Sequence, residues 1–334
     1  MKVNLKTLRK LSLTLFMIPG LSHSFSTEAL NDSVCSNMIK RKESSNHYIV
    51  HRPLTYKHEG NHYFLQKNKF FSLSNNGGEG TDSLSIDEYA VDFLVKENSL
   101  WTLGKNLIER DLMTGEVLNK YPTAPKEFSG MGKAKGFHQL GDKIYIAHGY
   151  LGLVVFDLSQ RKFVHTDRFN AKKHRGYPSE LVSISGESPS QLFIAMSSWR
   201  KGFEGIAVYN ASSKRVVHKM AYDKRRSGNV GPDTKIYQRG ESVFLNNGGW
   251  IHAFLTKNIL RYRTRKATWL PIAEDVETPD HHGRLNKLRK YRMIKGDFIF
   301  KDNQIMGCTQ YMEKVDGLKR PLTKAKVVSF SLRY

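Results

Sequence analysis

The chain has 334 residues, of which 53 are Lys or Arg and 31 are Asp or Glu, so its formal net charge is +22 at pH 7. Such a basic chain favours anionic partners such as nucleic acid, anionic glycans, lipid headgroups and acidic proteins, but its charge does not indicate a fold. Cys35 and Cys308 are the only cysteines. Two cysteines exclude a metal site of the zinc-ribbon type and allow a single disulfide.

The N-terminus has the pattern of a secretory signal. Four basic residues, Lys2, Lys6, Arg9 and Lys10, precede an apolar run over 11–21, and small serines follow it. This order predicts a signal peptide over 1–24, with the mature chain beginning after Ser24 or Ser26. The apolar run of roughly ten residues is about half of what a helix needs to cross a bilayer. We therefore expect a protein exported to the periplasm or the extracellular space, soluble and with no integral membrane anchor.

A repeat follows along the mature chain. Short apolar segments bounded by Gly, Asn, Ser and Lys begin at 61, 99, 143, 191, 242 and 304. Each is preceded or followed by further strand candidates, as in "KGFHQLGD" before the third segment and "GLVVFDLSQRKFVHT" after it. Four antiparallel strands per unit are typical of a propeller blade. The sequence predicts an all-β fold, a β-propeller of about six four-stranded blades over 47–334. Five or seven blades, a sandwich or a solenoid remain alternatives.

The two ends of the chain are expected to meet in the last blade. That blade ends at "KVVSFSLRY", which is its third strand, with no fourth strand after it. Residues 25–46 form an N-terminal segment, within which 34–42 are the candidate closing strand. Cys35 would then lie in the same blade as Cys308, so we expect these two residues to form a disulfide that clasps the ring.

Parts of the repeat resemble known propeller families. "IYIAHGYLGLVVFDLSQRKFV" resembles the repeats of YVTN- and LVIVD-type propellers, and "LWTLGKNLIERDLMTGEVL" resembles quinoprotein-type and NHL-like blades. "NNGGWIHAFLTKNILRYRTRKATWLPI" resembles a kelch unit, with Gly248 and Gly249 before Tyr262 and Trp269. The resemblance implies the propeller fold over nearly the whole mature chain. It implies no particular activity, because propellers carry many unrelated functions.

The sequence contains few signs of catalysis or metal binding. No Gly-x-Ser-x-Gly nucleophile elbow occurs, and we expect no metal and no cofactor. The adjacent His281 and His282 favour a solvated loop. The carboxylates Asp87, Glu88 and Asp92 favour an ordinary solvent face, since no ligand loop with a glycine accompanies them.

Blade topology predicts a functional face. The loops between second and third strands and the links between blades share one side of a propeller, and in this sequence both carry basic and aromatic residues. Lys and Arg beside aromatic rings suit sugar rings and anionic groups. We expect the ligand-binding residues of this rim to be Tyr150, Lys172, Lys173, Arg175, Trp199, Arg200, Lys201, Arg225, Arg226, Trp250, His252 and Tyr311.

Two functions are consistent with this pattern. The preferred hypothesis is a monomeric, non-enzymatic binding or scaffold propeller whose rim recognises an anionic glycan, an acidic protein or another polyanion. The alternative is a hydrolase, lyase or cyclotransferase with its site at the channel mouth. Its best acid and base candidates are His138, His148, His252 and Glu180, because histidine exchanges protons near neutral pH.

Overall fold

The computed structural model describes most of the repeat region. The described residues are 54–58, 61–66, 69–73, 84–86, 88–123, 134–149, 151–167, 179–198, 203–222, 230–231, 234–247, 250–261, 264–265, 268–269, 298–301, 304–313 and 322–331. Residues 1–53 lie outside this set, so the expected signal peptide, the closing strand and Cys35 stay predictions.

The described residues form six sheets, and each is numbered here as a blade in chain order. Blade 1 contains β1 (Leu54–His58), β2 (Asn61–Gln66), β3 (Lys69–Leu73) and β4 (Leu84–Ser85). Blade 2 contains β5 (Asp92–Lys96), β6 (Ser99–Leu103), β7 (Asn106–Asp111) and β8 (Val117–Pro122). Blade 3 contains β9 (Ala134–Leu140), β10 (Lys143–His148), β11 (Gly152–Asp157) and β12 (Lys162–Asp167).

The other three blades are less regular. Blade 4 contains β13 (Glu180–Ser188), β14 (Gln191–Ser197), β15 (Gly205–Asn210) and β16 (Arg215–Tyr222), and β20 (Thr264–Arg265) joins its edge. Blade 5 contains β17 (Lys235–Arg239), β18 (Ser242–Asn247), β19 (Trp250–Leu255) and β21 (Thr268–Trp269). Blade 6 contains β22 (Phe298–Lys301), β23 (Gln304–Glu313) and β24 (Leu322–Ser331). The expected all-β propeller of about six blades is confirmed.

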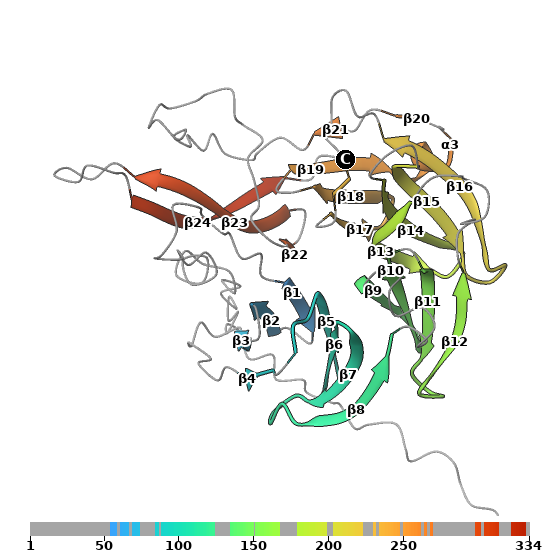
Figure 1. The fold of residues 1–334 in the computed structure, drawn as a ribbon. Helices are drawn as coiled ribbons and strands as arrows, with labels where there is room; N and C mark the ends of the chain where they lie inside the picture. Colours follow the sequence, from blue (N-terminus) through green and yellow to red (C-terminus); the bar gives the residue numbers. More distant parts are fainter. Residues whose placement is uncertain are drawn as a thin grey trace, which may run out of the picture.

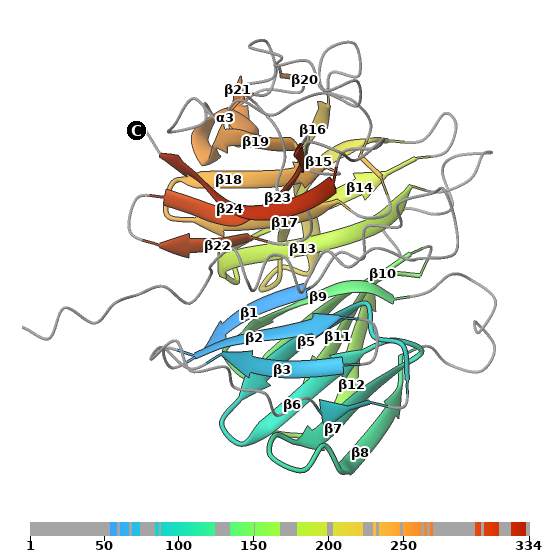
Figure 2. The same ribbon diagram turned by 90° about the vertical axis from the view of Figure 1, so that its left-hand side faces the viewer.

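The blades are arranged around a common axis. The first strands contact one another from β1 to β5, β9, β13 and β17, and β22 contacts β1. Figure 1 shows these strands toward the centre, with β8, β12 and β16 at the periphery. Blades 1–3 lie on one side of the molecule and blades 4–6 on the other, also after a 90° turn (Figure 2). Because every blade begins with its inner strand, each link to the next blade leaves from the same face of the ring.

The hydrophobic core lies between neighbouring blades. Leu103 of blade 2 packs in one cluster with Ile144 and Phe156 of blade 3, and all three side chains are 0% exposed. Blades 3 and 4 share a second cluster, and blades 4 and 5 a third. Full burial of each such side chain contributes about 1.5–3 kcal/mol. Interblade packing therefore fixes the ring, which positions the loops at its two faces.

Aspartate side chains shape the turns between third and fourth strands. Oδ1 of Asp157 accepts hydrogen bonds from the backbone N–H groups of Ser159 and Gln160, at 3.0 and 2.9 Å. Asp111 makes the same turn with Met113 and Thr114. These side chains replace missing backbone partners, which explains why Asp occurs at this position of the repeat.

Blade 5 differs from the regular repeat. Its third strand is β19, and α3 (Thr256–Arg261) follows that strand directly, before the short fourth strand β21. Trp250 therefore begins a strand where a loop was expected. The long loop expected around Tyr311 is also shorter, because β23 continues to Glu313 and pairs there with Leu322. In both places extended pairing satisfies backbone groups that a loop would expose. Within the described residues, no helix has the length and apolar character needed to span a bilayer.

Candidate functional site

An ion pair crosses the axis of the propeller. Lys235 Nζ of blade 5 lies 3.0 Å from Asp92 Oδ2 of blade 2, and the two side chains are only 16% and 18% exposed. Blades 2 and 5 are on opposite sides of a six-bladed ring. The same Asp92 oxygen accepts the backbone N–H of Phe137 in blade 3, at 3.0 Å. The expectation that Asp92 lies on a solvent face was wrong, because its carboxylate is directed inward and joins three blades.

Groups from four blades lie close to this pair. A Cβ atom on Gly136 would lie 3.0 Å from Asp92 Oδ2, 3.4 Å from Lys235 Nζ and 3.6 Å from the carbonyl oxygen of Val182. Blades 2, 3, 4 and 5 thus meet within a few ångströms. A methyl group at Gly136 would be in tight contact with Asp92 Oδ2, so this carboxylate would have to shift by a few tenths of an ångström.

Serine side chains join the inner strands of blades 4 and 5. The backbone N–H of Ile236 donates to Ser183 Oγ at 3.1 Å, and that of Gln238 donates to Ser185 Oγ at 2.9 Å. In this way β17 is tied to β13 although the two strands belong to different sheets. The sequence signal for this contact is the pair of serines at alternate positions of "LVSISGE".

Two of the four acid and base candidates are engaged in interblade contacts. His138 Nε2 lies 2.5 Å from the carbonyl oxygen of Gly186 and 3.2 Å from its backbone nitrogen. Burial lowers the pKa of His138. Glu180 is buried and forms an ion pair with Lys135, with 3.1 Å between Oε1 and Nζ. Both side chains therefore hold neighbouring inner strands together.

The other two candidates are buried histidines. His148 ends β10 and is 1% exposed, and burial lowers its pKa. His252 lies in β19, opposite Leu245 and Trp269, and is 0% exposed. Burial lowers the pKa of His252 to about 4. The imidazole of His252, which was expected on the rim, is buried and is not at the surface.

Most of the predicted rim residues lie outside the described part of the chain. These are Tyr150, Lys172, Lys173, Arg175, Trp199, Arg200, Lys201, Arg225 and Arg226. Trp250 begins β19 and Tyr311 lies in β23. Cys308 is also in β23, where its backbone pairs with Val327.

A cavity that the sequence did not indicate opens between blades 3 and 4. Its volume is about 170 Å³, and its lining includes Tyr145, Val155, His165 and Tyr209. Tyr145 is 5% and Tyr209 1% exposed, so the two rings form a buried wall. The hydroxyl of Tyr209 lies 3.4 Å from His165 Nε2. In the sequence, the cavity is indicated only by a tyrosine in a strand of each of the two blades. Core packing produces the same pattern.

The electrostatics of this cavity differ between its wall and its mouth. Burial raises the pKa of both Tyr145 and Tyr209, and the nearby Asp167 carboxylate raises that of Tyr209 further. Both tyrosines are therefore neutral hydrogen-bonding groups at physiological pH. Lys143 of blade 3 and Lys214 of blade 4 line the mouth.

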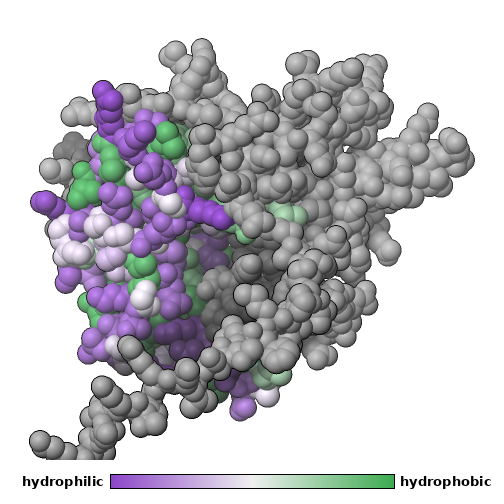
Figure 3. All heavy atoms as spheres, turned by 180° about the vertical axis from the view of Figure 1, so that it is seen from behind, coloured by the Kyte–Doolittle hydropathy of each residue, from purple (hydrophilic) through white to green (hydrophobic). Residues whose placement is uncertain are grey.

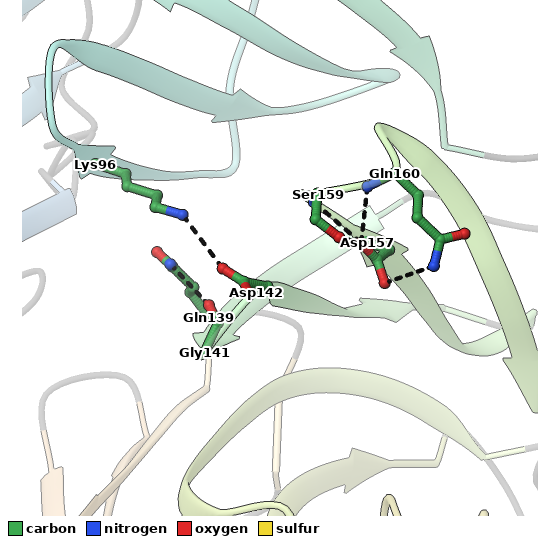
Figure 4. Close-up of polar contacts among 7 residues, drawn as sticks. All are labelled: Lys96, Gln139, Gly141, Asp142, Asp157, Ser159 and Gln160. Carbon is green, nitrogen blue, oxygen red and sulfur yellow. Dashed lines mark hydrogen bonds and ion pairs between the residues drawn. The ribbon is translucent and has the colours of Figure 1, made fainter.

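Asp157 also lines the mouth, but its charge is directed into its own turn. Its carboxylate accepts hydrogen bonds from Ser159 and Gln160, as Figure 4 shows. These hydrogen bonds, the Ser159 side chain first, lower the pKa of Asp157. The carboxylate is ionised and has few remaining acceptor positions for a ligand.

Among the described residues, metal ligands do not cluster, and apolar side chains do not gather on the face seen from behind. Within the described ranges, no group of three or more His, Cys, Asp or Glu side chains could hold a metal ion. Seen from behind, the described surface is mostly hydrophilic, with hydrophobic residues in small separate groups (Figure 3). That face therefore offers no broad apolar docking surface among the described residues.

Comparison with known proteins supports the fold alone. No protein-family model and no curated protein sequence matches the chain. Among solved structures, the extracellular domain of the proposed one component system BT4673 from B. thetaiotaomicron matches with a TM-score of 0.51 and 10% identity, over 88% of this chain and 34% of that one. BamB from Moraxella catarrhalis matches with a TM-score of 0.41 and 10% identity, over 83% and 71% of the two chains. The computationally designed Ika8 protein gives 0.43 and 9%, over 83% and 82%.

Proposed function

We propose that this protein is an exported, non-enzymatic binding propeller that holds a polyanion on the face carrying the interblade links. The observation that supports it best is the common direction of the inner strands. β12 ends at Asp167 and β13 begins at Glu180, while β16 ends at Tyr222 and β17 begins at Lys235. The segments between these ends, which contain Lys172, Lys173, Arg175, Arg225 and Arg226, start and finish on one face of the ring.

The described interior also favours binding over catalysis. His138 and Glu180, two of the acid and base candidates, form interblade contacts. An ion pair between blades 2 and 5 occupies part of the axis with protein side chains. A surface site on the rim does not need an open axis. An anionic glycan or an acidic protein could therefore bind through several basic side chains, with Trp199, Trp250 and Tyr311 supplying ring contacts.

Charge reversal on the two faces tests this proposal. The test variant reverses Lys172, Lys173, Arg225 and Arg226, and the control variant reverses Lys162, Lys214, Arg215 and Lys257. All four control residues lie at the opposite ends of the strands, in the turns after the third strands or in α3. Heparin and polyglutamate serve as probes at low and high salt.

The expected result is a loss of affinity of at least about tenfold for the test variant at low salt, because several weak ion pairs act together and salt screens them. Trp250→Ala should weaken binding by an amount that salt does not change. Equal losses for both charge variants would show that the charge is diffuse, and would overturn the proposal.

Export is the second part of the proposal, and it depends on the N-terminal pattern. Intact-mass analysis of the protein from its natural host should show a chain that begins after Ser24 or Ser26. A chain that retains Met1 in the envelope or medium fraction would contradict the export of a processed protein.

A further inference from the structure

Tyr89 is an exposed aromatic residue on the face that carries the interblade links, called the link face from here on. It lies in the link from blade 1 to blade 2, shortly before β5 begins, and it is 70% exposed. Its carbonyl oxygen lies beside Gly104, which belongs to the turn between β6 and β7 on the same face. Because a ring exposed to this extent contributes little to packing, it is available to a ligand.

The backbone that carries Tyr89 is held in place on both sides. Ile86 and Ala90 are 1% and 8% exposed, and both belong to the core cluster that blades 1 and 2 share. A Cβ atom at Gly104 would lie 2.5 Å from the carbonyl oxygen of Tyr89, so only glycine allows this close approach. The ring is thus presented from a fixed backbone, which reduces the entropy lost when a ligand binds to it.

The residues beside Tyr89 supply hydrogen-bonding groups that suit hydroxyls. Glu88 Oε2 accepts a hydrogen bond from Asn106 Nδ2 at 3.3 Å, and Glu88 Oε1 forms an ion pair with Lys120. The hydrogen bond from Lys120 is the largest cause of the lowered pKa of Glu88, so the carboxylate is ionised at neutral pH. The side chains of Glu88 and Lys120 are 34% and 50% exposed. Acceptor positions on the carboxylate and donors on the ammonium group therefore remain accessible to a ligand.

The Glu88–Lys120 pair discriminates between two kinds of polyanion. The two charges neutralise each other, so this part of the link face adds no net attraction for an acidic peptide, whose ionised side chains have no donor for the Glu88 carboxylate. A sugar ring has hydroxyls that donate to a carboxylate and accept from an ammonium group. Its C–H groups also pack on the negative face of an aromatic ring. An exposed tyrosine beside a carboxylate and an amide therefore matches a glycan better than an acidic protein.

We propose that the link face binds an anionic glycan, with one sugar ring stacked on Tyr89 and its hydroxyls bonded to Glu88 and Lys120. This inference rests on the function proposed above, and it selects the glycan from the polyanions named there. Acidic groups elsewhere on the same glycan would contact the basic residues of the interblade links.

Binding of heparin and of polyglutamate to the full chain tests this inference. Tyr89→Ala removes the ring and Tyr89→Phe retains it. Met113→Ala is the matched control, because Met113 is 81% exposed in the β7–β8 turn of the same blade, on the opposite face. Both positions are at the surface, so all three variants should keep the wild-type melting temperature.

We expect Tyr89→Ala to weaken heparin binding by at least about fivefold, the size of effect that marks a contributing interface residue. The same variant should bind polyglutamate normally, because polyglutamate has no sugar ring. Tyr89→Phe and Met113→Ala should bind heparin normally. The inference is overturned if Tyr89→Ala binds heparin normally or loses equal affinity for both probes. It is also overturned if Tyr89→Phe or Met113→Ala loses as much heparin affinity as Tyr89→Ala.

The charge variants described above separate this test from the test of the proposed function. If reversal of the link residues weakens heparin binding while Tyr89→Ala has no effect, the link face binds a polyanion and the sugar contact at Tyr89 is refuted. If charge reversal on the two faces gives equal losses while Tyr89→Ala weakens only heparin binding, the sugar contact is supported and the basic rim is refuted.

Discussion

The ion pair across the axis should be a major stabilising contact of the ring. Asp92→Ala removes the partner of Lys235 and the acceptor for the backbone N–H groups of Phe93 and Phe137, at 3.1 and 3.0 Å. Removal of one partner from a buried pair costs about 3–5 kcal/mol. Because both side chains retain some exposure, we expect a loss of about 3 kcal/mol in the free energy of unfolding.

Lys235→Met should cost less, about 1–2 kcal/mol, since the Asp92 carboxylate keeps its two backbone donors. The double variant should lose less than the sum of the two single variants, with a coupling energy of about 1–2 kcal/mol. Urea unfolding at neutral pH, followed by fluorescence, measures all three values. A loss of about 3 kcal/mol should also lower the melting temperature by about 5 °C or more.

The Lys96–Asp142 pair provides the control. Its two groups are 3.7 Å apart, and the side chains are 31% and 74% exposed. Exposed pairs contribute about 0–1 kcal/mol, so Asp142→Asn should change stability by less than about 0.5 kcal/mol. If Asp92→Ala costs no more than Asp142→Asn, or if the effects of the Asp92 and Lys235 variants simply add, the reasoning about the axial pair is wrong.

Three further predictions concern the disulfide, a glycine and acid stability. Cys35 and Cys308 should be oxidised, which adds about 2–4 kcal/mol by restricting the unfolded chain, and thiol labelling of the unfolded, unreduced protein should find no free thiol; two labelled thiols would refute the pairing. Gly205→Ala should destabilise blade 4 strongly, because φ is +153° and a Cβ atom would lie 2.2 Å from the carbonyl oxygen of Met220; thermal unfolding of this variant at wild-type temperature would contradict it. His252 has a folded-state pKa of about 4 against an ordinary 6.5, so the unfolded chain binds its proton first, and stability should fall by up to about 3 kcal/mol as pH decreases from 6.5 to 4. His252→Gln should reduce that dependence, and an unchanged pH profile between 6.5 and 4 would show that another group causes it.

The repeat allowed the fold to be predicted from the sequence. Short apolar segments at regular intervals, separated by Asx turns such as that of Asp157, report local preferences that hold in any context. All six second strands, from β2 to β23, begin at the residue where the repeat begins. Blade 5 is the exception to this regularity. Its segment 259–261 has a pattern that is compatible with both helix and strand, and packing against blades 4 and 5 selected the helix α3.

The candidate sites were harder to predict from the sequence, because each depends on residues that lie far apart in the chain. Asp92 and Lys235 are separated by 143 positions, and only closure of the ring brings them together across the axis. Tyr145 and Tyr209 could be assigned to the core from their strands, but not to a cavity, because its volume depends on how blades 3 and 4 face each other. Composition and periodicity can be read from the chain without knowledge of its contacts. They were therefore sufficient to predict the all-β class, the repeat and the basic charge. Whether a charged side chain is paired, buried or available to a ligand is decided by its neighbours in space, and these exist only once the blades have packed.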